Sequence, residues 1–142
     1  MLLDDLIPVG YQNDIEQLVN DYTFPWYTVN EISPGKFNDD LVTDSFGISH
    51  NLFCSQNGVS SQHFGFFKPI LYFLEQRTGV SPRRILRIRI RRTFNVIGHN
   101  ETKYNRPHVD LPKVEPFTTL VYYIDETDGD VSTHWLVFAG SV

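Results

Sequence analysis

Residues 86–91 read Leu-Arg-Ile-Arg-Ile-Arg, a strict alternation of aliphatic and cationic side chains. Successive side chains of a β-strand point to opposite faces of its sheet, so this run predicts a strand with one buried face and one polar face. The stretch also follows Ser81-Pro82, a dipeptide typical of a break between elements. It therefore marks the point at which the chain changes from helical to β character.

Two helices are expected before this strand. Residues 12–21 carry apolar side chains at helical spacing and predict a short amphipathic helix. Residues 62–76 carry a wider apolar stripe, and Gly79 is placed where a C′ glycine ends a helix. Pro69 lies inside this second pattern, so the helix is expected either to start near it or to kink there.

The remaining strands are expected on both sides of residues 86–91. Their composition is rich in aromatic and β-branched residues, and polar segments at 30–45 and 95–106 are expected as loops. The predicted strands cover residues 24–29, 46–53, 107–111, 117–124 and 134–138. Helices followed by an antiparallel β region indicate an α+β fold.

Composition narrows the class of protein. A chain of 142 residues with 41% hydrophobic residues fits one packed domain, here residues 1–142. The single cysteine, Cys54, excludes an internal disulfide and favours a reducing, cytoplasmic location. No apolar run reaches the roughly 20 residues that a membrane-spanning helix needs, so no membrane partner is expected. A net charge of −5 argues against general nucleic-acid binding, which depends on an excess of Lys and Arg.

A short motif suggests a metal site. His108 and Asp110 lie two residues apart on a predicted strand and would therefore point to the same side. An imidazole nitrogen and a carboxylate oxygen make up two thirds of the 2-His-1-carboxylate triad, which holds Fe(II) and leaves positions open for co-substrates. The alternative is a surface histidine and a strand-ending aspartate that share no ligand.

The surroundings of this motif resemble the iron- and 2-oxoglutarate-dependent dioxygenases of the prolyl-hydroxylase type. In that family a tyrosine precedes the His-x-Asp pair, and the next strand ends in Tyr-Tyr-Leu-Asn before a Gly-Asp or Asp-Gly-Gly turn. Further similarity upstream is to a marine phage and bacterial branch of the family. The segments that carry the resemblance are residues 24–27, 48–50, 87–90, 104–110, 117–125 and 128–130.

The resemblance implies a fold, an activity and site residues. The fold would be N-terminal helices packed on an antiparallel, cupin-like sheet, the double-stranded β-helix. His108 and Asp110 would bind Fe(II), and Tyr123 would hydrogen-bond a carboxylate of the co-substrate 2-oxoglutarate. Tyr104 is a weaker match for the same role, because it lies four residues before His108 where the family more often has three. The reaction would be hydroxylation of a C–H bond with release of succinate and CO2, on a small-molecule or protein side-chain substrate that the sequence does not identify.

The sequence also departs from the family. The double-stranded β-helix has eight strands, and fewer are readable here, so the sheet is expected to be incomplete. The family's distal histidine, and the Arg or Lys that follows it, have no counterpart at the usual distance, as in a C-terminally truncated member. His134 is the alternative third metal ligand; His50, His63 and His99 are weaker candidates.

Six of the twelve Lys and Arg residues lie between residues 83 and 92, and their role stays open at this point. Arg87, Arg89 and Arg91 could form a ribbon for phosphate or an acidic substrate, since guanidinium groups bind planar anions through two hydrogen bonds. They could instead be the solvated face of an edge strand, or could point into the barrel and bind 2-oxoglutarate.

Two other functional hypotheses follow from the same residues. One is a non-catalytic binding or assembly module, in which open sheet edges pair across a homodimer. The other is a cupin-like enzyme that uses His108, Asp110 and His134 to hold a different metal.

Overall fold

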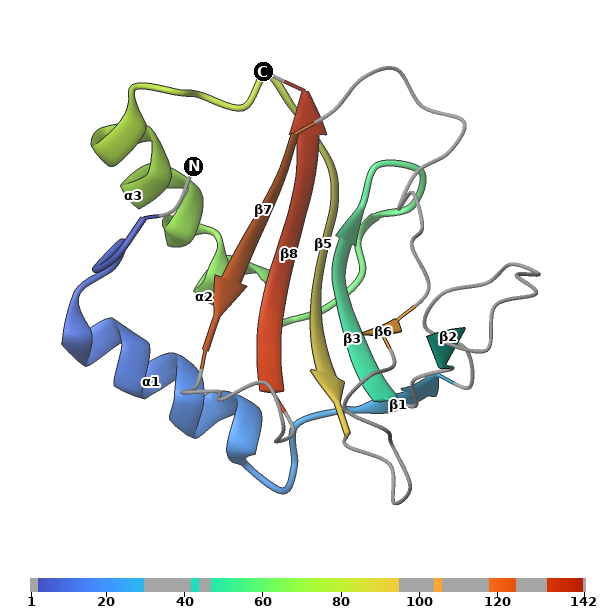
Figure 1. The fold of residues 1–142 in the computed structure, drawn as a ribbon. Helices are drawn as coiled ribbons and strands as arrows, with labels where there is room; N and C mark the ends of the chain where they lie inside the picture. Colours follow the sequence, from blue (N-terminus) through green and yellow to red (C-terminus); the bar gives the residue numbers. More distant parts are fainter. Residues whose placement is uncertain are drawn as a thin grey trace.

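The computed structural model describes residues 3–29, 42–43, 47–94, 104–105, 118–124 and 133–141, and describes 29, 42–43, 104–105 and 133–141 as backbone only. Three helices and eight strands occur in these ranges (Figure 1). The helices are α1 (Val9–Asn20), α2 (Phe64–Phe67) and α3 (Pro69–Thr78). The strands are β1 (Tyr27–Val29), β2 (Val42–Thr43), β3 (Gly47–Cys54), β4 (Gly58–Val59), β5 (Arg84–Thr93), β6 (Tyr104–Asn105), β7 (Thr118–Tyr123) and β8 (Thr133–Ser141).

Five strands form one antiparallel path in the order β1-β3-β5-β8-β7, with the short β4 paired to β3. The alternating strand β5 lies at the centre of this path, and the last strand, β8, lies between β5 and β7 (Figure 1). A second, two-stranded sheet pairs β2 with β6 in parallel.

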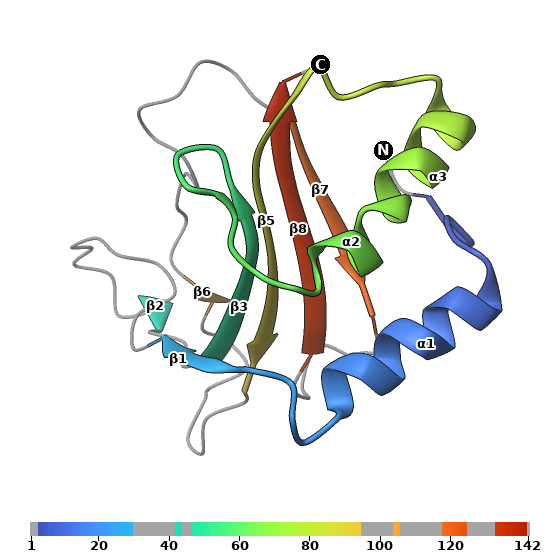
Figure 2. The same ribbon diagram turned by 180° about the vertical axis from the view of Figure 1, so that it is seen from behind.

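The helices lie together on one face of the large sheet (Figure 2). The apolar core joins both layers, because buried residues of the helices and of the strands belong to one cluster. From β5, Ile88 and Ile90 enter this core and are fully buried. The other members are Leu6, Ile7, Ile15, Val19, Phe24, Leu52, Phe67, Ile70 and Ile124.

Local sequence explains how the helical segment is divided. Pro69 occupies the first turn of α3, where its missing N–H costs no hydrogen bond, and α2 ends at the residue before Lys68. Gly79 ends α3 with φ of 70°, and its N–H donates to the Glu75 carbonyl at 2.8 Å. A left-handed C′ residue is the position that glycine fills without steric cost.

A β-bulge shapes β3. The pairing with β5 shifts between Asn51 and Phe53, which leaves Leu52 as an extra residue in the ladder. Leu52 is fully buried, and the Phe53 ring stacks on Phe64 with centroids 5.6 Å apart. The bulge therefore sends two consecutive apolar side chains into the core.

The α+β expectation is confirmed, because the helices cover one face of an antiparallel sheet (Figure 2). The helices do not all come first, since β1 to β4 lie between α1 and α2. The first helix begins at Val9 rather than at residue 12, because Pro8 supplies a fixed φ at its N-terminus. The strand expected at 134–138 is longer, Thr133–Ser141, since it pairs with β5 and β7 along its length. The strand expected at 107–111 lies outside the described residues, and the double-stranded β-helix stays a prediction. Within the described ranges, no helix is long and apolar enough to cross a bilayer.

Candidate functional site

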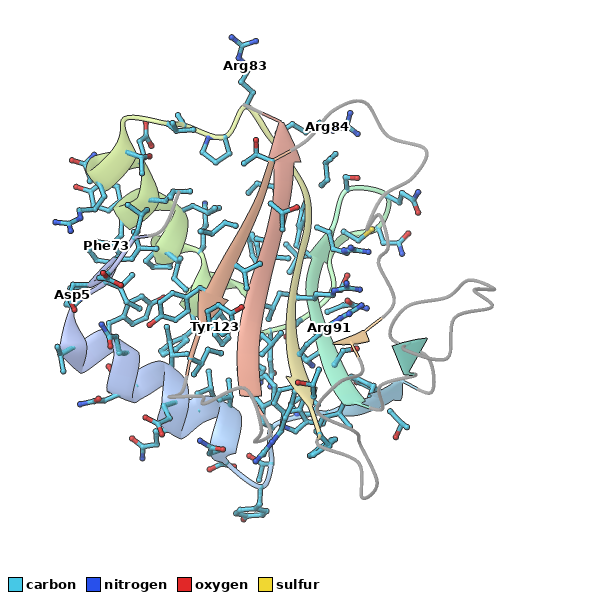
Figure 3. All side chains as sticks on the ribbon, in the orientation of Figure 1. Asp5, Phe73, Arg83, Arg84, Arg91 and Tyr123 are labelled. Atoms are coloured by element: carbon cyan, nitrogen blue, oxygen red, sulfur yellow. The ribbon has the colours of Figure 1, made fainter. Side chains whose placement is uncertain are left out.

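The large sheet has two chemically different faces. On β5 the aliphatic residues Ile88 and Ile90 lie under the helices, so the alternating arginines belong to the opposite face. Figure 3 labels Arg91 on the side of the sheet away from the helices. Arg91 is only 6% exposed, and Arg87 and Arg89 are half-buried. This arginine face is the candidate site.

The register aligns one residue from each of four strands in a row across this face. Arg91 pairs with Ser49 of β3 on one side and with Trp135 of β8 on the other, and Trp135 pairs in turn with Tyr123 of β7. Directly opposed residues of antiparallel strands share a face. Neighbouring strands lie about 4.8 Å apart, so the backbones at Arg91 and Tyr123 are separated by about 10 Å. Arg91 and Tyr123 therefore belong to the same face, on the two sides of position 135.

The positions beside the arginines on β3 are neutral. Ser49 pairs with Arg91, Asn51 with Arg89 and Cys54 with Arg87. A guanidinium that is largely removed from water must be compensated by hydrogen bonds or by negative charge. None of the three residues that pair with these arginines on β3 is a carboxylate.

The two neighbouring tyrosines of β7 differ in environment. Tyr122 packs against the helix-covered core, and this burial raises the pKa of its phenol. Tyr123 is 59% exposed and shares a face with Val121, which is also exposed. Of the pair, Tyr123 is the residue whose hydroxyl can meet a ligand on the arginine face.

Two of the weaker metal-ligand candidates lie on the opposite side of the sheet. His50 is 4% exposed, its Nδ1 donates to the Pro25 carbonyl at 2.7 Å, and its Nε2 lies 2.7 Å from Ser61 Oγ. Burial, more than any other influence, lowers the pKa of this imidazole, the Pro25 carbonyl opposes the shift, and nearby His63 adds to it. Both nitrogens of His50 are engaged, which argues against metal binding by this residue. The His63 ring is 6.0 Å from that of His50.

The remaining predicted site residues are placed only in part. His108 and Asp110, like His99, lie outside the described residues. Tyr104 occupies β6, where its backbone pairs with Val42. His134 occupies β8 at the register position opposite Arg92. Within the described ranges, no group of three His, Cys, Asp or Glu side chains could hold a metal ion.

Sequence patterns do not reveal two relations that the structure does. The contact between His50 and Ser61 joins residues from β3 and from the turn before α2, and no local motif signals it. The common row of Arg91 and Tyr123 depends on β8 lying between β5 and β7. From the sequence, the alternation of residues 86–91 predicts only that Arg91 lies on the polar face of its strand.

Comparison of the chain with models of protein families, with characterised proteins and with solved structures finds no match.

Proposed function

We propose that this chain is an iron- and 2-oxoglutarate-dependent dioxygenase-like protein whose arginine face holds the carboxylates of the 2-oxo acid. The observation that supports the proposal is the row that contains both Arg91 and Tyr123. A guanidinium on β5 and the phenol hydroxyl of an exposed tyrosine on β7, with the strand β8 between them, are donors suited to a short dicarboxylate.

The donor chemistry at the motif also fits the proposed metal. His108 and Asp110 would supply one imidazole nitrogen and one carboxylate oxygen, a set compatible with Fe(II). His134 stays a weak candidate for the third ligand. Iron bound there would supply the redox chemistry for C–H hydroxylation coupled to decarboxylation of 2-oxoglutarate. The family's double-stranded β-helix is part of the same proposal.

The chain's own residues would bind and orient the co-substrate. The Arg91 guanidinium would form paired, charge-assisted hydrogen bonds with one carboxylate, and Tyr123 would donate its hydroxyl proton to another oxygen of the ligand. Because Arg91 is almost completely buried, its electrostatic attraction for the anion is screened less than that of an exposed arginine.

Binding and turnover are measured separately. Calorimetry of 2-oxoglutarate binding should show a loss of affinity of about 10- to 100-fold in Arg91→Gln, since a hydrogen bond to a charged group contributes about 1.5–3 kcal/mol. Arg84→Gln is the matched control, because Arg84 lies on the same strand but is exposed at its start. Arg91→Lys separates loss of the bidentate fork from loss of charge.

Turnover is followed as succinate formed in the presence of Fe(II). Formation should require the metal and should be abolished by His108→Ala. Equal affinity of Arg91→Gln and Arg84→Gln for 2-oxoglutarate would contradict the role of the arginine face. A folded protein that shows neither binding nor Fe(II)-dependent succinate would contradict the oxygenase proposal as a whole.

A second candidate function is assembly without catalysis. Within the described residues β7 pairs with β8 alone, and it exposes Val121 and Tyr123. A strand of this kind can pair with the same strand of a second copy and so extend the sheet across a two-fold axis. Sedimentation would then show a homodimer that Val121→Lys dissociates, with Val59→Lys, on the short strand β4, as the control. A monomer at all concentrations would exclude this candidate.

A further inference from the structure

The environment of Ser61 contains the parts of an activated nucleophile, on the helix-covered side of the sheet and apart from the arginine face. Its Oγ is 2.7 Å from His50 Nε2, and His50 Nδ1 is 2.7 Å from the Pro25 carbonyl oxygen. A carbonyl oxygen only accepts hydrogen bonds, so Nδ1 carries the proton. In the neutral imidazole Nε2 is then the acceptor, and the Ser61 hydroxyl donates to it.

This arrangement has the geometry of nucleophilic catalysis. An activated serine needs a base within about 2.6–3.2 Å and a third group that fixes the tautomer and orientation of that base. His50 meets the first requirement, and the Pro25 carbonyl meets the second. The aromatic rings of Phe24 and Tyr27, with centroids 4.8 and 6.1 Å from the imidazole, further restrict its movement.

The backbone holds Ser61 in a defined position. Ser60 lies between β4 and Ser61, and its N–H donates to the Leu52 carbonyl at 2.9 Å. The Ser61 carbonyl accepts from the Phe64 N–H at 3.2 Å, and Ser61 Oγ accepts from the His63 N–H at 3.1 Å. Ser61 is half-buried, and its Oγ is held between His50 Nε2 and the His63 N–H.

An open hollow adjoins this segment. Its volume is about 490 Å³, and its lining includes Gln62 and His63, the two residues after Ser61. Asp14 and Asp21 supply carboxylates to the same lining, beside Thr23. Such a surface disfavours an anionic acyl group and suits a neutral or cationic one.

We infer that Ser61 is the nucleophile of a Ser–His dyad that accepts acyl groups from neutral or cationic esters. Ser61 Oγ forms a bond to the ester carbonyl carbon while its proton passes to His50 Nε2. The C–O bond to the leaving alcohol then breaks, and His50 returns the proton to that oxygen. Water, deprotonated by His50, attacks the acyl-serine and releases the acid, which restores both residues.

The first test is covalent labelling of the full chain with a fluorophosphonate, which loses fluoride on forming a bond to an activated serine. Peptide mass spectrometry should find the adduct at Ser61 and should find none in Ser61→Ala. His50→Gln should slow labelling by about 100-fold or more, since a general base contributes on the order of 10² to 10⁴. Ser60→Ala is the matched control and should label like the parent, because the Ser60 hydroxyl donates only to the Gly58 carbonyl.

The second test needs no substitution at the dyad and so holds even if His50→Gln fails to fold. The labelling rate of the parent protein should rise with pH as one group loses its proton, with a midpoint below that of an ordinary histidine, because burial lowers the pKa of His50. Among the described residues, the titratable groups that face the imidazole are His63 and Tyr27. His63→Gln should keep a profile with a single ionisation, and its midpoint should rise towards that of an ordinary histidine, because His63 contributes to lowering the pKa of His50. p-Nitrophenyl acetate, whose acyl group is neutral, should also react faster than p-nitrophenyl hemisuccinate, whose acyl group carries a carboxylate.

Two outcomes would overturn the inference. One is folded parent protein whose Ser61 stays unlabelled at every pH. The other is labelling whose rate is the same in His50→Gln or is independent of pH, since His50 would then be only a structural partner of Ser61. The test of 2-oxoglutarate binding by Arg91 is independent of either result, because Arg91 lies on the other face of the sheet.

Discussion

Ile88→Ala tests whether the helices and the central strand share one core. Ile88 is fully buried on β5, the strand that lies between β3 and β8, and it belongs to the cluster that includes helix residues Phe67 and Ile70. The substitution removes three carbon atoms, and at about 0.8 kcal/mol for each the transfer term is about 2.4 kcal/mol. The unfilled cavity raises the expected loss of unfolding free energy to about 3–4 kcal/mol.

Urea unfolding, followed by circular dichroism and tryptophan fluorescence, measures this loss. The midpoint should fall while the dependence of the free energy on urea stays the same, because the surface exposed on unfolding is nearly unchanged. Ile88→Val should lose about 1 kcal/mol. Val121→Ala, at an exposed position of β7, should lose less than about 1 kcal/mol. A loss below about 1 kcal/mol for Ile88→Ala would refute a single core that joins the sheet to the helices.

Three further predictions concern particular residues. Burial lowers the pKa of His50 in the folded chain. The contribution of His50 to the free energy of unfolding is therefore present above its unfolded pKa of about 6.5 and is lost as pH falls through the folded pKa. Urea unfolding across this acid range should show this loss of stability, and His50→Gln should make the loss smaller. Burial, assisted by Tyr122, raises the pKa of Tyr11 to about 12. The contribution of Tyr11 to the free energy of unfolding is therefore present below its unfolded pKa near 10 and is lost as pH rises towards 12. The ultraviolet absorbance of tyrosinate should report an ionisation in this range that is absent in Tyr11→Phe. Gly79→Ala should destabilise the fold by about 1 kcal/mol because the φ of Gly79 is 70°, whereas Gly65→Ala, inside α2, should stabilise it by several tenths of a kcal/mol. Thermal unfolding should therefore show shifts of opposite sign for the two variants. An unchanged melting temperature in Gly79→Ala would contradict the left-handed cap.

The sequence alone was sufficient for features with a local cause. The alternation of residues 86–91 predicted a strand with one buried face, and Ile88 and Ile90 are buried in the core while the arginines are on the other face. Pro69 and Gly79 divided and ended the helical segment as expected. Each of these features follows from steric or periodic properties of a few neighbouring residues.

Other features had no local signal. The bulge at Leu52 arises from pairing between β3 and β5, because the extra residue exists only relative to a partner strand. The roles of His108 and Asp110 stay predictions, since both residues lie outside the described ranges. The hydrogen bonds of His50 changed its interpretation from a weak metal candidate to a base beside Ser61.

The sequence by itself determined the main helical segments, the longer strands β3, β5, β7 and β8, and which side chains share a face of β5. It missed the short strands β2 and β6, which lie in segments expected as loops. Only the tertiary structure decided that β8 enters between β5 and β7 and so sets Arg91 and Tyr123 in one row. It also brought Pro25, His50 and Ser61 together across the core. The physical reason is that a strand's periodicity is fixed by its own backbone, whereas strand order is fixed by competition among long-range pairings and by burial of the shared apolar face.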